Sequence, residues 1–377
     1  MARLYFDHNA TSPLRPAARA AMLAALDAGN ASSVHAEGRA ARAKIESARA
    51  LLARHFGVKP ELVIFTSGAT EAANMALRPG LAGLACDRLL IGGGEHPCVV
   101  SGHGFDEAAV ARVALDAQGR LDLADLRENL AGAQTPMLAL QAANNETGVI
   151  QPVAEAAARV HEAGGVLVCD AVQAFGRIAC SFAATGADVL FVSSHKIGGP
   201  KGIGAAIFSR RAVLPARALL RGGGQERGQR GGTENVAAIA GFAAAVQEVL
   251  AQGAQEMTRL GALRDRIEAA VRALAPEAVV FGAGAPRLPN TMAFALPGFS
   301  AETLVAALEV EGVALSSGSA CSSGKVSASA VLAAMGVAPE IARGALRISL
   351  GWPNSEQEGV AFPELLAKVR QRMRSRA

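Results

Sequence analysis

Short apolar runs alternate with longer alanine-rich stretches between about residue 60 and residue 210. The runs are four or five residues long and mostly lack charges, as expected for strands that are buried on both faces. They are Leu62 to Phe65, Arg88 to Ile91, Met137 to Leu140, Val166 to Cys169, Asp188 to Val192 and Gly204 to Phe208. The stretches between them are helical in composition, so the pattern predicts βα repeats around a parallel sheet.

The pattern changes after residue 220. A Gly- and Arg-rich stretch from Arg221 to Gly232 predicts a loop, and the alanine-rich region that follows it to about Leu274 predicts a connecting helix. Beyond it, strand-like and helical runs predict a smaller α+β unit: Thr291 to Leu296, Ala301 to Glu311, Val313 to Leu315 and Ala345 to Leu350. We therefore expect a large domain over residues 16–249 and a small α+β domain formed by residues 1–15 and 250–377.

Composition narrows the class of protein. With 377 residues, 51% of them hydrophobic, the chain can fill two cores. The longest apolar stretch, Val236 to Val246, is too short to span a bilayer, and no apolar leader is evident, so we expect a cytoplasmic protein without a membrane span. The net charge is +4 but aromatic residues make up only 4%, which argues against direct nucleic-acid binding by stacking.

Five scattered cysteines without a CxxC pair argue against a disulfide framework and against a zinc site. Cys169 lies in an apolar run, and we read it, with Cys86 and Cys180, as an inert small hydrophobic residue. Cys98, two residues after His96, is left open. Cys321 differs because it lies in the Ser- and Gly-rich segment from Ser316 to Gly324, where a thiol is accessible and can react.

Small polar residues follow the first of the predicted strands. Thr66-Ser67-Gly68-Ala69-Thr70-Glu71 opens a helix, whose free N–H groups, together with the Thr70 hydroxyl, can hold a phosphate. A plain N-cap turn would have the same sequence. The chain contains neither a GxxxxGK[ST] motif nor a clean GxGxxG motif, so a small phosphorylated cofactor is favoured over a nucleotide.

Two ionisable residues follow neighbouring predicted strands. Asp170 directly follows the run from Val166 to Cys169, and Lys196 follows the run from Asp188 to Val192. In a parallel sheet the carboxyl ends of both strands lie at the same edge, so both side chains can reach one crevice. A buried carboxylate requires a hydrogen-bond donor such as a pyridinium nitrogen. A lysine that forms a Schiff base and an aspartate that faces the pyridinium are the signature of pyridoxal 5′-phosphate, although a lysine snorkelling from a strand end remains the alternative.

A set of motifs makes the interpretation more specific. The chain contains TSGATE, His96-Pro97, NNETG from Asn144, DAVQ from Asp170, SSHKIGGPKGIG, RGGTEN and SSGSAC, in this order. Together they resemble the NifS/IscS-like cysteine desulfurases, which belong to class V of the fold-type I enzymes that depend on pyridoxal phosphate. The resemblance runs from the Asp7 to Thr11 segment to Arg347 and implies an α/β fold, with a mostly parallel seven-stranded sheet flanked by helices.

The resemblance also assigns roles to individual residues. It implies that Lys196 binds the cofactor covalently, that Asp170 holds the pyridine nitrogen and that Gln173 contacts the ring oxygen. His96 would stack on the ring and take part in catalysis. The phosphate would be held by Ala69, Thr70, Ser193, His195 and, from a second subunit of a homodimer, Thr233. Asn145 and Arg347 would hold the cofactor edge and the substrate carboxylate, which suits a guanidinium. We interpret His8 and His35 as surface or packing residues without a catalytic role, and the resemblance offers a position near the entrance as the alternative.

The implied reaction removes sulfur from L-cysteine, which leaves L-alanine and a persulfide on Cys321 for transfer to an acceptor. By family analogy the acceptor is an iron–sulfur scaffold protein. We expect no resident metal, although Cys321 could transiently ligate an iron–sulfur cluster. Gly198 and the stretch from Lys325 to Ser329 depart from the common family pattern, which leaves tRNA thiolation and nitrogenase maturation open as roles.

Two alternatives remain at this level. One is a related class V enzyme that acts on another amino acid, such as a selenocysteine lyase, a kynureninase or an aminotransferase, none of which needs the cysteine segment. The other is an assembly protein with low intrinsic turnover.

Overall fold

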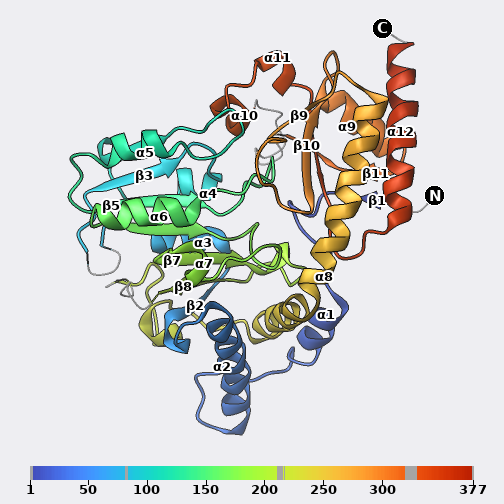
Figure 1. Cartoon of the computed structure of the whole chain (residues 1–377). Coiled ribbons are helices and arrows are strands. Elements are labelled where there is room, and N and C mark those ends of the chain that lie inside the picture. Colours follow the sequence, from blue (N-terminus) through green and yellow to red (C-terminus); the bar gives the residue numbers. More distant parts are fainter. Residues whose placement is uncertain (1–2, 81–83, 210–214, 216, 319–328, 376–377) are drawn as a thin grey trace.

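The computed structural model describes residues 3–80, 84–209, 215, 217–318 and 329–375. A seven-stranded sheet has the order β2-β8-β7-β6-β5-β3-β4 (Figure 1). Its strands are β2 (Val63–Thr66), β3 (Arg88–Gly92), β4 (Val110–Val113), β5 (Pro136–Gln141), β6 (Val166–Asp170), β7 (Val189–Ser193) and β8 (Gly204–Phe208). The six predicted strands agree with six of these to within one residue at each end. The half-exposed edge strand β4 was missed because its sequence, VARV, lacks a continuous apolar run.

The central strands are buried on both faces, which explains their continuous apolar sequences. In β6, Leu167 and Cys169 pack into one core cluster and Val166 and Val168 into another. The same alternation holds in β5, β7 and β8, as expected when successive side chains point to opposite faces. Helices therefore cover both faces of the sheet.

One strand of the sheet runs against the others. β8 pairs antiparallel with both β2 and β7, whereas the remaining pairs are parallel. The predicted parallel repeat fails here because only residues 194–203 join β7 to β8, and no crossover helix lies between them. The fold is thus the expected α/β class with a mostly parallel seven-stranded sheet.

A second, four-stranded sheet lies beside the first, in the order β12-β13-β10-β9, and a pair β1-β11 adjoins it. The strands are β1 (Leu4–Tyr5), β9 (Val279–Val280), β10 (Thr291–Ala295), β11 (Val313–Ala314), β12 (Ser316–Ser317) and β13 (Ala345–Ser349). A third core cluster is formed by β10, β13, α9 and α12, together with Phe6. The chain therefore starts in the same unit in which it ends.

The helices divide between the two units. They are α1 (Pro16–Leu23), α2 (Ala36–Phe56), α3 (Ala69–Ala76), α4 (Pro97–Val100), α5 (Leu123–Leu130), α6 (Val153–Glu162), α7 (Phe182–Thr185), α8 (Val236–Leu274), α9 (Ala301–Val310), α10 (Ala330–Ala334), α11 (Pro339–Ala342) and α12 (Glu356–Arg374). Figure 1 shows α8 running from α1 beside the large sheet towards α9 and α12.

α8 has the length and composition of a membrane span, but half of its most apolar window is buried inside the protein. Its first half contributes Phe242 and Val246 to the core of the large sheet, and its second half contributes Leu263 and Ile267 to the small unit. It therefore packs as a core helix that belongs to both units. The expected domain boundary at residue 249 falls within α8 and stays a prediction.

Candidate active site

A cavity of about 650 Å³ opens beyond the carboxyl ends of the parallel strands, where an α/β sheet is expected to bind its ligand. Most of the residues expected at the site line this cavity: Ala69, Thr70, His96, Asn145, Asp170, Gln173, Ser193, His195, Lys196 and Arg347. Thr233 lies instead in a second cavity of about 210 Å³, which shares Ser67 and Gly202 with the first. Cys321 lies outside the described residues.

The turn after β2 forms one end of the cavity. Gly68 precedes α3 with φ of 157°, and Ala69 and Thr70 are the first helical residues, so their N–H groups have no partner inside the helix. Gly204 lets β8 pass close to this turn, because a Cβ there would stand 2.9 Å from the Gly68 backbone. The turn thus presents N–H donors and the positive end of a helix to an anion.

Asp170 is buried at the end of β6, between Gln141 of β5 and Phe191 of β7. Burial raises the pKa of its carboxyl to about 6, against the opposing effects of the hydrogen bond from the Val172 N–H (2.8 Å) and the charge of Lys196. A carboxylate in this position favours a cationic or protonated ring nitrogen as its neighbour.

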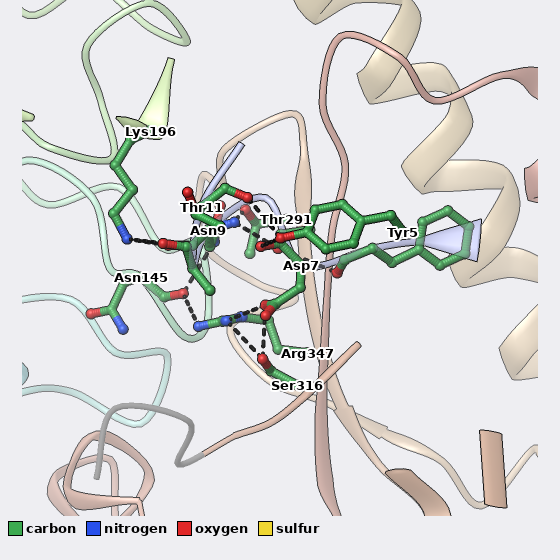
Figure 2. Close-up of polar contacts among 12 residues, drawn as sticks. Tyr5, Asp7, Asn9, Thr11, Asn145, Lys196, Thr291, Ser316 and Arg347 are labelled. Carbon is green, nitrogen blue, oxygen red and sulfur yellow. Dashed lines mark hydrogen bonds and ion pairs between the residues drawn. The ribbon is translucent and has the colours of Figure 1, made fainter. Parts of the chain in front are cut away.

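Lys196 ends a short 3-10 turn, Ser194–Lys196, directly after β7. Its Nζ donates to the carbonyl oxygens of Asn9 (2.5 Å) and Ala10 (2.9 Å), so it contacts the N-terminal segment instead of snorkelling to solvent (Figure 2). The sequence did not predict these contacts, because backbone carbonyls carry no side-chain signal. Strand ends therefore place Lys196 and Asp170 in one cavity, as predicted.

His96 and His195 flank the cavity, and burial lowers the pKa of both. His96 caps α4, and its Nδ1 accepts from the Cys98 N–H (3.1 Å), which leaves the proton of the neutral ring on Nε2. Burial and the charge of Lys196 lower the pKa of His96. The pKa of His195 falls to about 4, first through burial and then through the charges of Lys196 and Lys201.

His8 and His35 were interpreted as packing or surface residues, and the structure agrees, with His8 buried and His35 exposed. His8 is buried, its Nδ1 lies 2.8 Å from the Ser12 hydroxyl, and burial lowers its pKa to about 3. His35 is exposed and caps α2, where its ring accepts from the Gly38 N–H.

Gln173 is held by a half-buried arginine that the sequence interpretation did not include. Arg177 Nη1 donates to Gln173 Oε1 and to Asn9 Oδ1 (3.0 Å), and Gln173 Nε2 donates to the Asn9 carbonyl (3.0 Å). These contacts fix which end of the Gln173 amide faces each partner. The i,i+4 spacing of Gln173 and Arg177 gave no signal for this contact, because the two residues lie in a turn and not in a helix.

Arg347 of β13 is 1% exposed and meets the N-terminal segment. Its Nη2 donates to Asp7 Oδ1 (2.6 Å) and to the Ser316 hydroxyl (3.1 Å), and its Nη1 donates to the Asn145 carbonyl (3.1 Å). Its Nε has no partner among the described residues. Figure 2 shows Arg347 and Lys196 reaching the segment from Asp7 to Thr11 from two sides. The role of Asp7 was missed because its partner lies 340 residues away.

The four cysteines that the structure describes are buried and free. Burial raises the pKa of the Cys86 thiol to about 11 and that of Cys180 to about 12, and it raises those of Cys98 and Cys169 as well. Such thiols are protonated at neutral pH and react poorly. Cys98 lines the main cavity but shares this property.

The comparisons with known proteins identify the family. The model of the family described as "Aminotransferase class-V" matches residues 4–361 of the chain. The chain belongs to this family. A cysteine desulfurase of Frankia sp. (strain EuIK1) is 40% identical to this class-V chain, covering 99% of it and 92% of the relative.

Solved structures agree with this assignment. A NifS-like protein from Rickettsia africae superposes on this class-V chain with a TM-score of 0.89 at 30% identity, over 98% of this chain and 99% of that one. SspA, solved in complex with cysteine, superposes with a TM-score of 0.76 at 27% identity, over 92% and 98%. The resemblance and the fold inferred from the sequence motifs are therefore confirmed.

Class-V enzymes depend on pyridoxal phosphate, and the residues of the cavity fit this cofactor. The N–H donors of Ala69 and Thr70 suit a phosphate, and the buried Asp170 suits the ring nitrogen. Lys196 supplies the amine that the aldehyde requires. The individual contacts remain predictions.

Proposed function

We propose that this chain is a pyridoxal-phosphate-dependent cysteine desulfurase that converts L-cysteine to L-alanine and leaves a persulfide on Cys321. The observation that carries the proposal is the shared cavity of Lys196, Asp170 and Arg347, in a chain similar throughout to cysteine desulfurases. The structural neighbour SspA was solved with cysteine, which supports the same substrate.

The residues of the cavity have distinct tasks in this proposal. The cofactor, when bound, supplies an electron-withdrawing ring that lowers the cost of negative charge on substrate carbon. Asp170, as a carboxylate, keeps the ring nitrogen protonated, and Lys196 Nζ takes and returns protons at the substrate carbon. Arg347, beside Asn145, binds the substrate carboxylate and orients the molecule.

Sulfur transfer balances without an external redox agent. The Cys321 thiolate attacks the substrate sulfur, so that a sulfur–sulfur bond forms while the carbon–sulfur bond breaks. The electron pair of the broken bond stays with the substrate carbon, which takes a proton and becomes the methyl group of alanine. Sulfur is oxidised to the persulfide level and carbon is reduced. An added thiol or an acceptor protein then removes the sulfur.

The deciding experiment measures alanine and sulfide from L-cysteine in the presence of a thiol reductant, with wild-type protein and Cys321→Ala. We expect the variant to lose sulfide release while its visible cofactor band still responds to L-cysteine. Full sulfide release by Cys321→Ala would contradict the mechanism. A selenocysteine lyase or aminotransferase would produce little sulfide from L-cysteine, even as wild type.

Lys196→Ala tests the cofactor attachment separately. We expect this variant to lose the visible absorbance of lysine-bound cofactor, while Lys201→Ala, which alters another lysine of the cavity, keeps it. Cofactor that remains covalently bound to Lys196→Ala after denaturation would show that another residue holds it.

We further propose that the enzyme is a cytoplasmic homodimer that donates sulfur to iron–sulfur cluster assembly. Thr233 faces a neighbouring cavity instead of that of Lys196, which supports its expected role toward the cofactor of the partner subunit. The four free thiols described suit a reducing compartment. Light scattering tests the dimer, and transfer of labelled sulfur to a purified scaffold protein tests the acceptor class.

A further inference from the structure

Asn9 lines the main cavity and is 1% exposed, and its backbone carbonyl contacts two of the residues expected at the site. The carbonyl oxygen accepts from Lys196 Nζ (2.5 Å) and from Gln173 Nε2 (3.0 Å). Every residue type has a backbone carbonyl, so the choice of asparagine must be explained by its side chain.

The side chain of Asn9 is held at both ends of its amide. Its Oδ1 accepts from Arg177 Nη1 (3.0 Å), and its Nδ2 donates to the Asn145 carbonyl (3.1 Å) and to the Thr291 hydroxyl (3.0 Å) (Figure 2). An arginine only donates and a carbonyl only accepts, so a single orientation of the amide satisfies these partners. The backbone N–H of Asn9 donates to the Ser349 hydroxyl (2.9 Å). Side chain and backbone are therefore fixed together.

Arg177 closes this network around Lys196. Its Nη1 also donates to Gln173 Oε1, and its Nη2 donates to the Lys196 backbone carbonyl (3.3 Å). Lys196 is thus held at its backbone by Arg177 and at its Nζ by Asn9, and these two partners are bonded to each other. Members of such a network stabilise one another, so loosening Asn9 should also loosen the lysine amine.

Asn9 also connects the lysine to the proposed substrate-carboxylate site. The Asn145 carbonyl accepts both from Asn9 Nδ2 and from Arg347 Nη1 (3.1 Å each). One amide therefore sets the place of the Lys196 amine relative to the residues that would hold the substrate. This placement matters for proton transfer, because a displacement of about 1 Å can cost about a hundredfold in rate.

We propose that Asn9 is a positioning residue, which holds the Lys196 amine at its backbone carbonyl whenever that amine is not bonded to the cofactor. The inference rests on the proposed function, in which Lys196 takes and returns protons at the substrate carbon. A carbonyl oxygen that accepts from an ammonium group stabilises the charged form, so Asn9 also makes Lys196 a stronger base. The amine then stays within reach of the substrate carbon after the substrate has displaced it.

The first test measures the basicity of Lys196 in the apoprotein, without any turnover. Trace labelling with acetic anhydride between pH 7 and 11, followed by mass spectrometry, gives the fraction of neutral amine at each pH. We expect the midpoint of the Lys196 profile to move about one pH unit lower in Asn9→Ala, as for the loss of a hydrogen bond to a charged group. The profile of Lys201, another lysine of the cavity, should not move and serves as the internal reference.

The ionisable groups around Lys196 are the same in both proteins, so they do not produce this difference. They are His96, Cys98, Asp170, Arg177, His195 and Lys201.

The second test follows proton transfer in the protein loaded with cofactor. L-Alanine has no sulfur to transfer, so the exchange of its α-proton for deuterium in heavy water reports the base alone. At saturating L-alanine we expect exchange by Asn9→Ala to be about tenfold slower. Thr291→Val removes one acceptor of the Asn9 amide and keeps the shape of the side chain, so it should slow exchange by a smaller factor. It also provides the measurement if Asn9→Ala fails to fold.

Asn354→Ala separates positioning from a loss of stability. Asn354 is buried like Asn9, and its side chain makes three hydrogen bonds within the small unit. The variant should lower the melting temperature but leave the Lys196 profile and the exchange rate at their wild-type values. Equal changes in Asn354→Ala and Asn9→Ala would reduce Asn9 to a structural role and overturn the inference.

The outcomes also distinguish the inference from the proposed function. Wild-type protein that forms no alanine from L-cysteine would overturn the proposed function, while labelling of the apoprotein would still report the contact between Asn9 and Lys196. If wild type is active, an unchanged Lys196 profile or an unchanged exchange rate in Asn9→Ala would overturn only the positioning role.

Discussion

The Asp7 carboxylate contacts the Arg347 guanidinium at 2.6 Å, where the arginine side chain is 2% exposed and the aspartate side chain 21%. The guanidinium that we expect to bind the substrate carboxylate is thus already neutralised on one side by a residue of the chain. Its Nε and Nη1 are left for other partners: among the residues that the structure describes, Nε has no partner and Nη1 contacts only the Asn145 carbonyl.

Asp7→Asn should therefore destabilise the protein and strengthen its response to carboxylate ligands. Removing one partner of a buried pair leaves an uncompensated charge and costs about 3 kcal/mol. A ligand carboxylate can replace the missing charge, so L-alanine should raise the melting temperature more in Asp7→Asn than in wild type.

The control for this prediction is Asp265→Asn, which alters an exposed carboxylate paired with Arg264 and should change stability little. An identical ligand shift in Asp7→Asn and wild type would contradict the shared use of Arg347.

Cofactor affinity should weaken as the pH falls below about 6. Burial raises the pKa of Asp170 from 3.8 to about 6. Below this pH the carboxyl group is protonated. Only the ionised carboxylate accepts a hydrogen bond from a protonated ring nitrogen, so cofactor binding must expel the proton. Titration of the apoprotein with pyridoxal phosphate between pH 5 and 8 measures this effect. Asp170→Asn should bind more weakly throughout and show a flatter profile, and a profile as steep as that of wild type would contradict the assignment.

Glu146 should make the stability of the apoprotein fall with rising pH. Burial raises its pKa from 4.5 to about 7, although Ser329 and the charge of Arg347 act in the opposite direction. Because the folded state holds the proton more tightly, the contribution is full below pH 4.5 and is lost as the pH rises to about 7. The shift corresponds to about 3 kcal/mol.

Glu146→Gln cannot titrate and should remove this dependence. Its stability relative to wild type, from urea unfolding, should increase between pH 5 and 8. A constant difference across this range would show that Glu146 is already ionised at pH 5.

The Arg49–Glu226 pair should be needed to hold the loop that carries Thr233. Both side chains are buried, their two hydrogen bonds are 2.6 and 2.8 Å, and Glu226 adopts a positive φ of 47°. Glu226→Ala leaves Arg49 uncompensated and should cost about 3 to 5 kcal/mol in the free energy of unfolding. Arg227→Ala removes an exposed pair with Glu46 at the next position and should have little effect. Comparable losses in the two variants would contradict this ranking.

The sequence predicted those features that depend on local pattern. Apolar runs located the strands that are buried on both faces, and the residues after those runs, Asp170 and Lys196, proved to share a cavity. β4 was missed because it is half exposed, and the direction of β8 was missed because a continuous apolar run carries no sign of direction.

Contacts between distant segments could not be predicted in the same way. Lys196 donates to the backbone of Asn9 and Ala10, which any residue type would provide. His8 follows β1, which pairs with β11, and it is buried as a packing residue. The register of β1 against β11, together with the bridge between Asp7 and Ser349 of β13, sets which side chains of this segment reach the cavity.

The position of Asp7 also has a consequence for biosynthesis. Its partner Arg347 leaves the ribosome some 340 residues later, and β1 cannot pair until β11 has been made. The turn after β2 that we expect to bind the cofactor phosphate can form early together with Asp170, since domains fold as their residues emerge, but the contacts that we expect to orient the substrate must wait for the end of synthesis. A nascent chain could thus capture its cofactor long before it could act on cysteine, which would keep reactive sulfur from being released by an unfinished enzyme.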